Sequence, residues 1–115
     1  MNHKALVSIA LCTYNGEAYL REQLDSIVNQ SYSPLELIAV DDCSSDNTLS
    51  ILKEYAANYP FIKVFVNPKN LGYIRNFEKA LKLCSAEFIA LSDQDDIWDL
   101  HKIEKQVKAI GNHLL

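Results

Sequence analysis

The sequence lacks any apolar run close to the roughly 20 residues that a membrane-spanning helix requires, although 49% of its 115 residues are hydrophobic. The apolar run from Ala5 to Cys12 is shorter than a secretory leader needs, and the polar residues Thr13 to Asn15 interrupt it. We therefore expect a cytoplasmic protein, either free or peripheral to the inner face of the membrane, with no membrane span.

Basic residues and paired cysteines are also scarce. The 11 Lys and Arg residues are outnumbered by 15 Asp and Glu residues, which gives a net charge of −4 and argues against a nucleic-acid partner. The three cysteines, Cys12, Cys43 and Cys84, lie far apart and show neither metal-ligand nor redox spacing. We expect reduced and mostly buried thiols.

Glycine is rare as well, with only three in the chain (Gly16, Gly72 and Gly111). The sequence contains neither G-x-G-x-x-G after its first apolar run nor G-x-x-x-x-G-K-[ST] anywhere. The backbone therefore offers no glycine-rich cradle, and phosphate groups must meet a metal ion or a basic side chain. Arg75 is the candidate side chain, and an ordinary exposed surface charge is the alternative.

The apolar pattern alternates between short runs and longer stretches with helical spacing. Strands are predicted at about 6–12, 35–40, 61–66 and 88–91, and helices at about 16–30, 73–83 and 100–112, with a further helix that starts from a cap within residues 45–48 and ends before Tyr59. Leu81 of the third helix and Ile110 of the last are expected to face inward. This alternation predicts one α/β domain over residues 1–115. We expect a Rossmann-like, open and mainly parallel sheet of about four strands with helices on both faces.

Polar side chains collect where the predicted strands end, which is the edge of an open α/β sheet that binds ligands. The first strand is followed by polar residues, and the second and fourth by acids: Thr13, Tyr14, Asn15 and Glu17; Asp41 and Asp42; Asp93, Asp95 and Asp96. Several carboxylates at one edge repel one another unless a cation compensates them. Oxygen ligands suit Mg²⁺ or Mn²⁺, so the pattern predicts a divalent metal site.

Each candidate also has a structural interpretation. We favour helix capping for Asp46 and Asp99, because both stand where a predicted helix begins. Tyr14 suits stacking on a base and equally a half-buried aromatic role, whereas Trp98 is expected to pack beneath the acidic loop. The three histidines form no catalytic or zinc pattern.

Four segments resemble motifs of the family 2 glycosyltransferases, which have the GT-A fold. Residues 7–17 resemble the family's opening strand and loop, and residues 40–48 resemble its V-D-D-x-S-x-D-x-T signature. Residues 70–77 are similar to its N-x-G segment, and residues 91–98 to its D-x-D motif. The segments occur in the family's order and span nearly the whole chain, so together they are far more specific than any one alone.

The resemblance implies a role for each matching residue. Thr13, Tyr14, Asn15 and Glu17 would line a nucleoside pocket. Asp42, with Asp41 nearby, would accept a hydrogen bond from the imide N–H of uracil or thymine, and Arg75 would help to hold the nucleotide. Asp93 would lie near the ribose and sugar, and Asp95, with Asp93 beside it, would hold Mg²⁺ or Mn²⁺.

The reaction implied is metal-dependent, inverting transfer of a sugar from a UDP- or dTDP-sugar to an acceptor hydroxyl in polysaccharide biosynthesis, with a glycan or lipid-linked acceptor. Family members usually continue for about another domain, and no residue here matches their general base. We therefore expect a domain that is C-terminally truncated relative to the family and inactive alone. We also expect an exposed sheet edge through which two copies pair.

Other functions are compatible with parts of the pattern. A non-catalytic nucleotide-binding or oligomerisation module would share the pocket and the metal site. A phosphoacceptor receiver domain fits poorly, because Asn67 and Pro68 follow the third predicted strand. A nucleotidyltransferase would need a glycine-rich, basic first loop in place of residues 13–16. The sequence leaves open the donor sugar and the choice between uridine and thymidine.

Overall fold

The computed structural model describes residues 4–93 and 95–114. Strands and helices alternate along the chain, and their ends lie within two residues of the predicted ones. The elements are β1 (Val7–Thr13), α1 (Glu17–Val28), β2 (Leu35–Asp41), α2 (Thr48–Asn58), β3 (Ile62–Val66), α3 (Tyr73–Leu83), β4 (Phe88–Ser92) and α4 (Lys102–Leu114). Within the described ranges, no helix is both long and apolar enough to cross a membrane.

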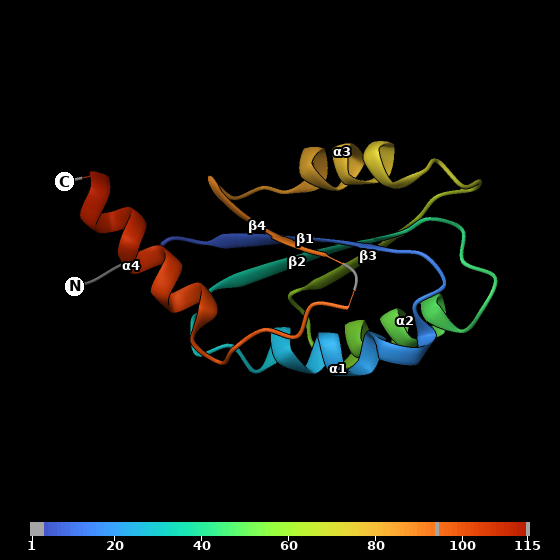
Figure 1. The fold of residues 1–115 in the computed structure, drawn as a ribbon, viewed down its shortest axis with the longest axis horizontal. Helices are drawn as coiled ribbons and strands as arrows, with labels where there is room; N and C mark the ends of the chain where they lie inside the picture. Colours follow the sequence, from blue (N-terminus) through green and yellow to red (C-terminus); the bar gives the residue numbers. More distant parts are fainter. Residues whose placement is uncertain (1–3, 94, 115) are drawn as a thin grey trace.

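The four strands form one parallel sheet in the order β3-β2-β1-β4. The chain builds outward from β1 through β2 to β3 and then returns to place β4 on the other side of β1. Helices α1 and α2 therefore cover one face and α3 covers the other (Figure 1), as right-handed crossovers require when the direction reverses. The predicted parallel sheet with helices on both faces is confirmed, and the reversal places the acidic loop after β4 beside the end of β1.

Each face of the sheet has its own core. The larger one contains Ile9, Leu24 and Leu52, and the smaller one joins Val40 to Ala80 of α3. All seven residues of β1 are buried because helices cover both its faces. Trp98 belongs to the larger core and is only 7% exposed, as predicted.

Three residues depart from the predicted burial. Leu81 and Ile110, expected to face inward, are 39% and 36% exposed. Leu81 lies near Leu91 of β4 and Ile110 lies across the groove from β4, at an edge of the sheet that no further strand of the described chain covers. Cys43 is also exposed, contrary to the expectation of mostly buried thiols, because it lies in the loop after β2.

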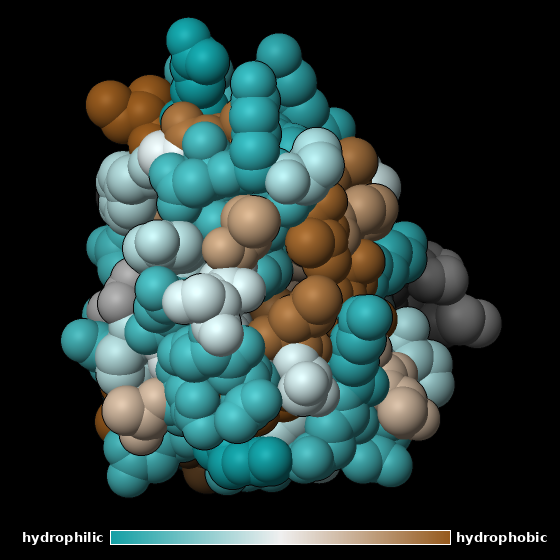
Figure 2. Space-filling view, turned by 90° about the vertical axis from the view of Figure 1, so that its right-hand side faces the viewer, coloured by the Kyte–Doolittle hydropathy of each residue, from teal (hydrophilic) through white to brown (hydrophobic). Residues whose placement is uncertain are grey.

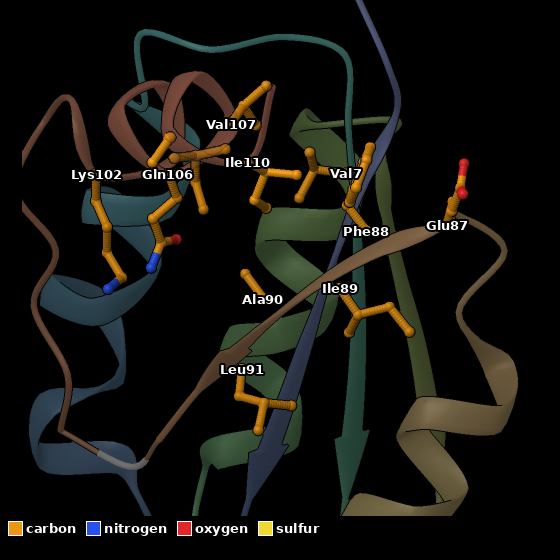
Figure 3. Close-up of a pocket in the computed structure, with 12 residues that line it drawn as sticks. Val7, Glu87, Phe88, Ile89, Ala90, Leu91, Lys102, Gln106, Val107 and Ile110 are labelled. Atoms are coloured by element: carbon orange, nitrogen blue, oxygen red, sulfur yellow. The ribbon is translucent and has the colours of Figure 1, made fainter. Parts of the chain in front are cut away.

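A groove of about 520 Å³ runs between β4 and α4. Figure 3 shows apolar side chains of both elements around it, including Ala90, Val107 and Ile110, with Glu87 and Lys102 at opposite ends. Among the described residues β4 pairs with β1 alone, so its outer edge keeps free backbone groups. The exposed sheet edge that the sequence predicts is therefore present.

Glu36, at the start of β2, is a buried acid far from the acidic loop. Its carboxylate accepts hydrogen bonds from Ser8 Oγ at 2.6 Å, Lys63 Nζ at 3.0 Å and the Ser85 N–H at 3.0 Å. Burial alone would raise the pKa of Glu36, but these hydrogen bonds outweigh it and lower the pKa to about 2. The charged form of Glu36 is thus the one that joins β1, β2, β3 and the loop before β4.

We predict that Glu36 makes the fold sensitive to acid. Because the folded pKa lies below the ordinary glutamate value of 4.5, the stabilisation is complete above about pH 4.5 and is lost as the pH falls towards about 2. Glu36→Gln should lower the free energy of unfolding at neutral pH by about 2 kcal/mol. Urea unfolding across this pH range should show the difference from the wild type shrinking in acid. The exposed Glu78→Gln serves as control, and a pH-independent difference for Glu36→Gln would contradict the prediction.

Candidate functional site

The loops that leave the carboxyl ends of the strands share a backbone feature. Each contains one residue with positive φ within the described chain: Asn15 at 50°, Cys43 at 64°, Gly72 at 88° and Asp95 at 73°. Residues other than glycine are strained in this region, and such strain concentrates at functional sites. Figure 2 views the molecule from this end, where a band of apolar surface lies between hydrophilic areas.

Asp42 organises the third of these loops from the end of β2. Its buried carboxylate accepts hydrogen bonds from the N–H groups of Leu71 and Gly72, at 2.7 and 3.0 Å. The side chain of Asn67 donates a further one at 2.8 Å. Gly72 presents its N–H to Asp42 with a φ of 88°, a conformation that glycine adopts without strain. The N-x-G segment is therefore folded back against the end of β2.

Asp41 has a different task, because its side chain joins the first two loops. The carboxylate is 1% exposed and accepts hydrogen bonds from Thr13 Oγ1 at 2.7 Å and Ser44 Oγ at 2.6 Å. The Ser44 N–H donates to its other oxygen at 3.0 Å. Both carboxylate oxygens of Asp41 are thus occupied by protein groups.

Asn15 and Glu17 also bind the second loop. The Asn15 side-chain oxygen accepts the Ser45 N–H at 2.8 Å, and Glu17 accepts the Asn47 N–H at 3.2 Å. Neither side chain lines the hollow described next. These two predicted pocket residues lie in the contact between the first two loops.

Asp46 and Asp99 lie just before helices, where the sequence indicates capping, although the N-cap residue of α2 itself is Asn47. Asp46 accepts the N–H of Thr48, the first residue of α2, at 3.0 Å, and also that of Glu17, the first residue of α1, at 3.2 Å. One carboxylate therefore supports two helix N-termini. Asp99 accepts the His101 N–H at 3.2 Å, just before α4 begins.

A hollow of about 220 Å³ lies between the first loop, Asp42 and the start of α3. It is lined by Cys12, Thr13, Tyr14, Asp42, Asn70, Gly72, Tyr73 and Asn76. Thr13, Tyr14 and Asp42 are thus the predicted nucleoside-pocket residues that the fold brings together here. The Tyr14 ring is 46% exposed and available for stacking.

The pKa of the Cys12 thiol is affected by the charges around this hollow. Burial, followed by the nearby charges of Asp42 and Asp93, raises the pKa of Cys12 to about 12. The thiol is therefore neutral at physiological pH, and it is not an activated nucleophile. Acids that follow β2 and β4 are thus both near enough to Cys12 to raise its pKa, as expected when both strands flank β1.

The acidic loop after β4 is closed by hydrogen bonds between its own residues. The Asp93 N–H donates to Asp96 Oδ2, and the Asp96 N–H donates to the Asp93 carbonyl, both at 3.1 Å. Asp93 Oδ1 accepts the Tyr73 hydroxyl at 2.9 Å. Asp95 is exposed, and its carboxylate accepts no hydrogen bond from the described part of the chain. Gln94 lies outside the described residues.

The acidic loop fits a divalent metal by its donor chemistry. Within residues 4–93 and 95–114, no three His, Cys, Asp or Glu side chains converge into a site that could hold an ion by themselves. Mg²⁺ and similar ions are commonly held by one or two carboxylates together with substrate phosphates. Asp95, with an open carboxylate, and Asp93, with one oxygen bound to Tyr73, could supply that protein share.

Arg75 lies on the first turn of α3, between the lining residues Tyr73 and Asn76 in sequence, but does not itself line the hollow. It is exposed and shares an adjoining depression with Gly72 and Tyr73. It forms no ion pair within the described chain. Its guanidinium is therefore near the site and uncommitted to another protein charge.

Two glutamines that the sequence analysis did not single out hold the segment between β4 and α4. Gln23 is 1% exposed, and its amide donates to Ser92 Oγ at 3.0 Å and to the Asp93 carbonyl at 2.6 Å. Gln30 donates to the Asp99 carbonyl at 2.7 Å and accepts the Ile103 N–H at 3.1 Å. A polar residue on the apolar stripe of a helix was the available signal for Gln23.

With this geometry established, comparison with known proteins identifies the family. The model of glycosyl transferase family 2 matches residues 8–114. The chain therefore belongs to this family.

Among curated relatives, an uncharacterized glycosyltransferase of Haemophilus influenzae is 41% identical over 93% of this chain and 33% of its own length. The dTDP-rhamnosyl transferase RfbG of Shigella flexneri is 37% identical over 87% of this chain and 36% of its own. The chain thus spans about a third of the length of these relatives.

Solved glycosyltransferase structures have the same fold. S. aureus TarS 1–349 in complex with UDP superposes with a TM-score of 0.86 at 32% identity, covering 93% of this chain and 32% of that 1–349 chain. The mannosyltransferase PcManGT from Pyrobaculum calidifontis, in complex with GDP-Man and Mn²⁺, gives 0.81 at 25% identity, over 94% of this chain and 32% of its own. The GT-A-like fold that the resemblance implied is confirmed.

We predict that Gln23 fixes the start of the acidic loop. Gln23→Leu removes two hydrogen bonds and leaves the buried Ser92 hydroxyl without its amide donor, which should lower the free energy of unfolding by about 1–3 kcal/mol. Amide hydrogen exchange should become faster at residues 93–96. Gln106→Leu, at an exposed residue of α4 that lines the groove beside β4, is the matched control. Unchanged exchange in the Gln23 variant would show that the loop holds itself.

Proposed function

We propose that this chain binds the nucleoside diphosphate part of an activated sugar donor, in a glycosyltransferase that inverts the anomeric configuration. The observation that carries the proposal is the hollow beside Asp42, with Tyr14 on its wall and the acidic loop at its rim. Its size and lining suit a pyrimidine ring, and a carboxylate there suits the imide N–H. Relatives or neighbours named for UDP and dTDP-rhamnose support a pyrimidine nucleotide.

Different residues would bind different parts of the donor. Asp42 would accept the imide hydrogen of uracil or thymine, and Tyr14 would stack on the ring. Asp41, Asn15 and Glu17 would act indirectly, because they fix the first loop, which lines the hollow, against the second loop. Arg75 would meet negative charge on the nucleotide from the start of α3.

Asp95 and Asp93 would hold Mg²⁺ or Mn²⁺ against the donor diphosphate. When bound, the ion would act as a Lewis acid that stabilises negative charge on the departing diphosphate. The Mn²⁺ in the PcManGT complex supports a divalent ion in this fold. We propose that residues 1–115 alone do not transfer sugar, since no residue here has been assigned to deprotonate the acceptor hydroxyl. A glycan or lipid-linked acceptor and a cytoplasmic location also remain predictions.

We predict that nucleotide binding depends on a divalent ion through Asp95. Calorimetric titration with UDP and with dTDP should give tighter binding in Mn²⁺ than in EDTA, and Asp95→Asn should reduce the Mn²⁺ effect by about tenfold, ~1.4 kcal/mol. Asp99→Asn is the control, because asparagine also caps helices well. Two results for the wild type would refute the metal-dependent donor site. One is no binding of either nucleotide, and the other is the same affinity in EDTA as in Mn²⁺.

We also propose that two copies pair through the β4 edge. The unpaired backbone of β4 and the apolar groove beside it support this arrangement. Sedimentation velocity at about 50 μM, a concentration at which micromolar affinities are visible, should detect a dimer. Ile89→Lys should give a monomer, because a charge at a strand edge opposes pairing. Ile74→Lys, on the exposed surface of α3, should remain dimeric. A monomeric wild type would exclude the pairing.

A further inference from the structure

Tyr73 is the one side chain that both lines the hollow and binds an acid of the acidic loop by hydrogen bond within the described chain. It is the first residue of α3 and follows Gly72, whose N–H is held by Asp42. Its ring packs edge-to-face on Phe77, with 4.9 Å between the ring centroids. The backbone before Tyr73 and the ring itself are thus both fixed by neighbours.

The hydroxyl of Tyr73 reaches Asp93 from the α3 side of the sheet. It donates to Asp93 Oδ1 at 2.9 Å, while Gln23 donates to the Asp93 carbonyl from α1 on the opposite side. The Asp93 N–H is taken by Asp96 within the loop. Asp93 is therefore held at its backbone and at one carboxylate oxygen, and its other oxygen accepts no hydrogen bond from the described residues.

We propose that Tyr73 is a positioning residue that couples occupation of the hollow to the orientation of Asp93. The inference rests on the proposed donor site. A pyrimidine ring in the hollow contacts the Tyr73 ring, and the position of that ring sets the hydroxyl that orients Asp93. An ion bound by Asp93 and Asp95 favours the same orientation from the other end. Binding in the hollow and at the acidic loop then favour each other reciprocally, as two sites coupled through one element must.

Tyr73 would differ from a wall residue, meaning one that only lines the hollow. A wall residue contributes its ring alone, so removing the hydroxyl would leave every ligand unaffected. A coupling residue needs the hydroxyl as well, and its loss should weaken only what depends on Asp93. Tyr73→Phe keeps the ring and its packing on Phe77, and it removes one oxygen on a side chain that is 64% exposed. The variant should therefore fold normally.

The experiment compares uridine, UDP and UDP with Mn²⁺ by calorimetry on the wild type and Tyr73→Phe, with thymidine and dTDP in parallel. Uridine affinity should stay within about twofold, whereas the gain from Mn²⁺ should fall about threefold to tenfold. Buried groups that orient metal ligands typically contribute about 10- to 100-fold to metal affinity, and Tyr73 is expected to contribute less because it is exposed.

Tyr55→Phe is the matched control. The Tyr55 hydroxyl donates to Asp25 Oδ1 at 2.6 Å, so this variant also breaks a tyrosine–aspartate hydrogen bond, but one between α2 and α1 and away from the hollow. Its Mn²⁺ gain should equal that of the wild type, and thermal melting should show all proteins folded.

Three outcomes would overturn the coupling. An unchanged Mn²⁺ gain in Tyr73→Phe would show that the hydroxyl does not matter. Equal losses for uridine and for UDP with Mn²⁺ would show that the hydroxyl acts on nucleoside binding in the hollow and not through Asp93. A wild type without Mn²⁺-dependent nucleotide binding would refute the proposed function and the coupling together. Either of the first two results would refute the coupling and leave the proposed function intact.

Discussion

The carboxylate of Asp42 is the interaction on which the shape of the ligand-binding end depends. It stands at the end of β2, in the middle of the parallel sheet, and it binds the backbone N–H groups of Leu71 and Gly72. A buried charge is costly unless donors satisfy it. The loop between β3 and α3 supplies them, and in doing so it takes the course that leaves the hollow open. The start of α3, and with it Tyr73 and Arg75, is placed by that loop.

The remaining acids at this edge have separate duties, although they look alike in the sequence. Asp41 and Asp46 hold the first two loops together and are bound by protein donors. Asp95 is exposed and has no donor within the described residues. A carboxylate without protein donors, beside several that have them, is the arrangement expected where a bound cation compensates the remaining negative charge. The neutral thiol of Cys12, between Asp42 and Asp93, adds no further charge.

The order and ends of the elements could be read from the sequence because polarity changes sharply where the strands stop. Val40 is apolar and buried, and Asp41 and Asp42 follow it at once, so the end of β2 was expected here, and the strand extends only one residue further, to Asp41. The clustering of acids at one edge follows from parallel pairing, which brings all carboxyl ends together. Trp98 was placed correctly because a large apolar ring next to a loop needs a core to cover it.

The division of labour within the site could not be read in the same way. Asn15 and Glu17 turn to the second loop because Asn15 has a positive φ, which residue type alone does not dictate. Gln23 meets Ser92 and Asp93 across 69 and 70 positions of sequence, a contact that only the assembled sheet creates. Leu81 and Ile110 fit an apolar helical stripe, yet the stripe extends past the edge of what the described chain covers.

The pairing of the last strand with the first has a consequence for how the protein folds. Val7 pairs with Phe88, so the contact joins residues 81 positions apart (88 − 7). Contacts between distant residues are slow to form, because the entropy of closing a long loop is lost before the contact is gained. The loop carrying Asp93 and Asp95 leaves β4 directly, and its anchors Gln23 and Tyr73 belong to α1 and α3. The acidic loop therefore reaches its native form only when the whole sheet has assembled. In a partly folded chain, Asp93 and Asp95 would be exposed to water but not arranged to bind an ion together.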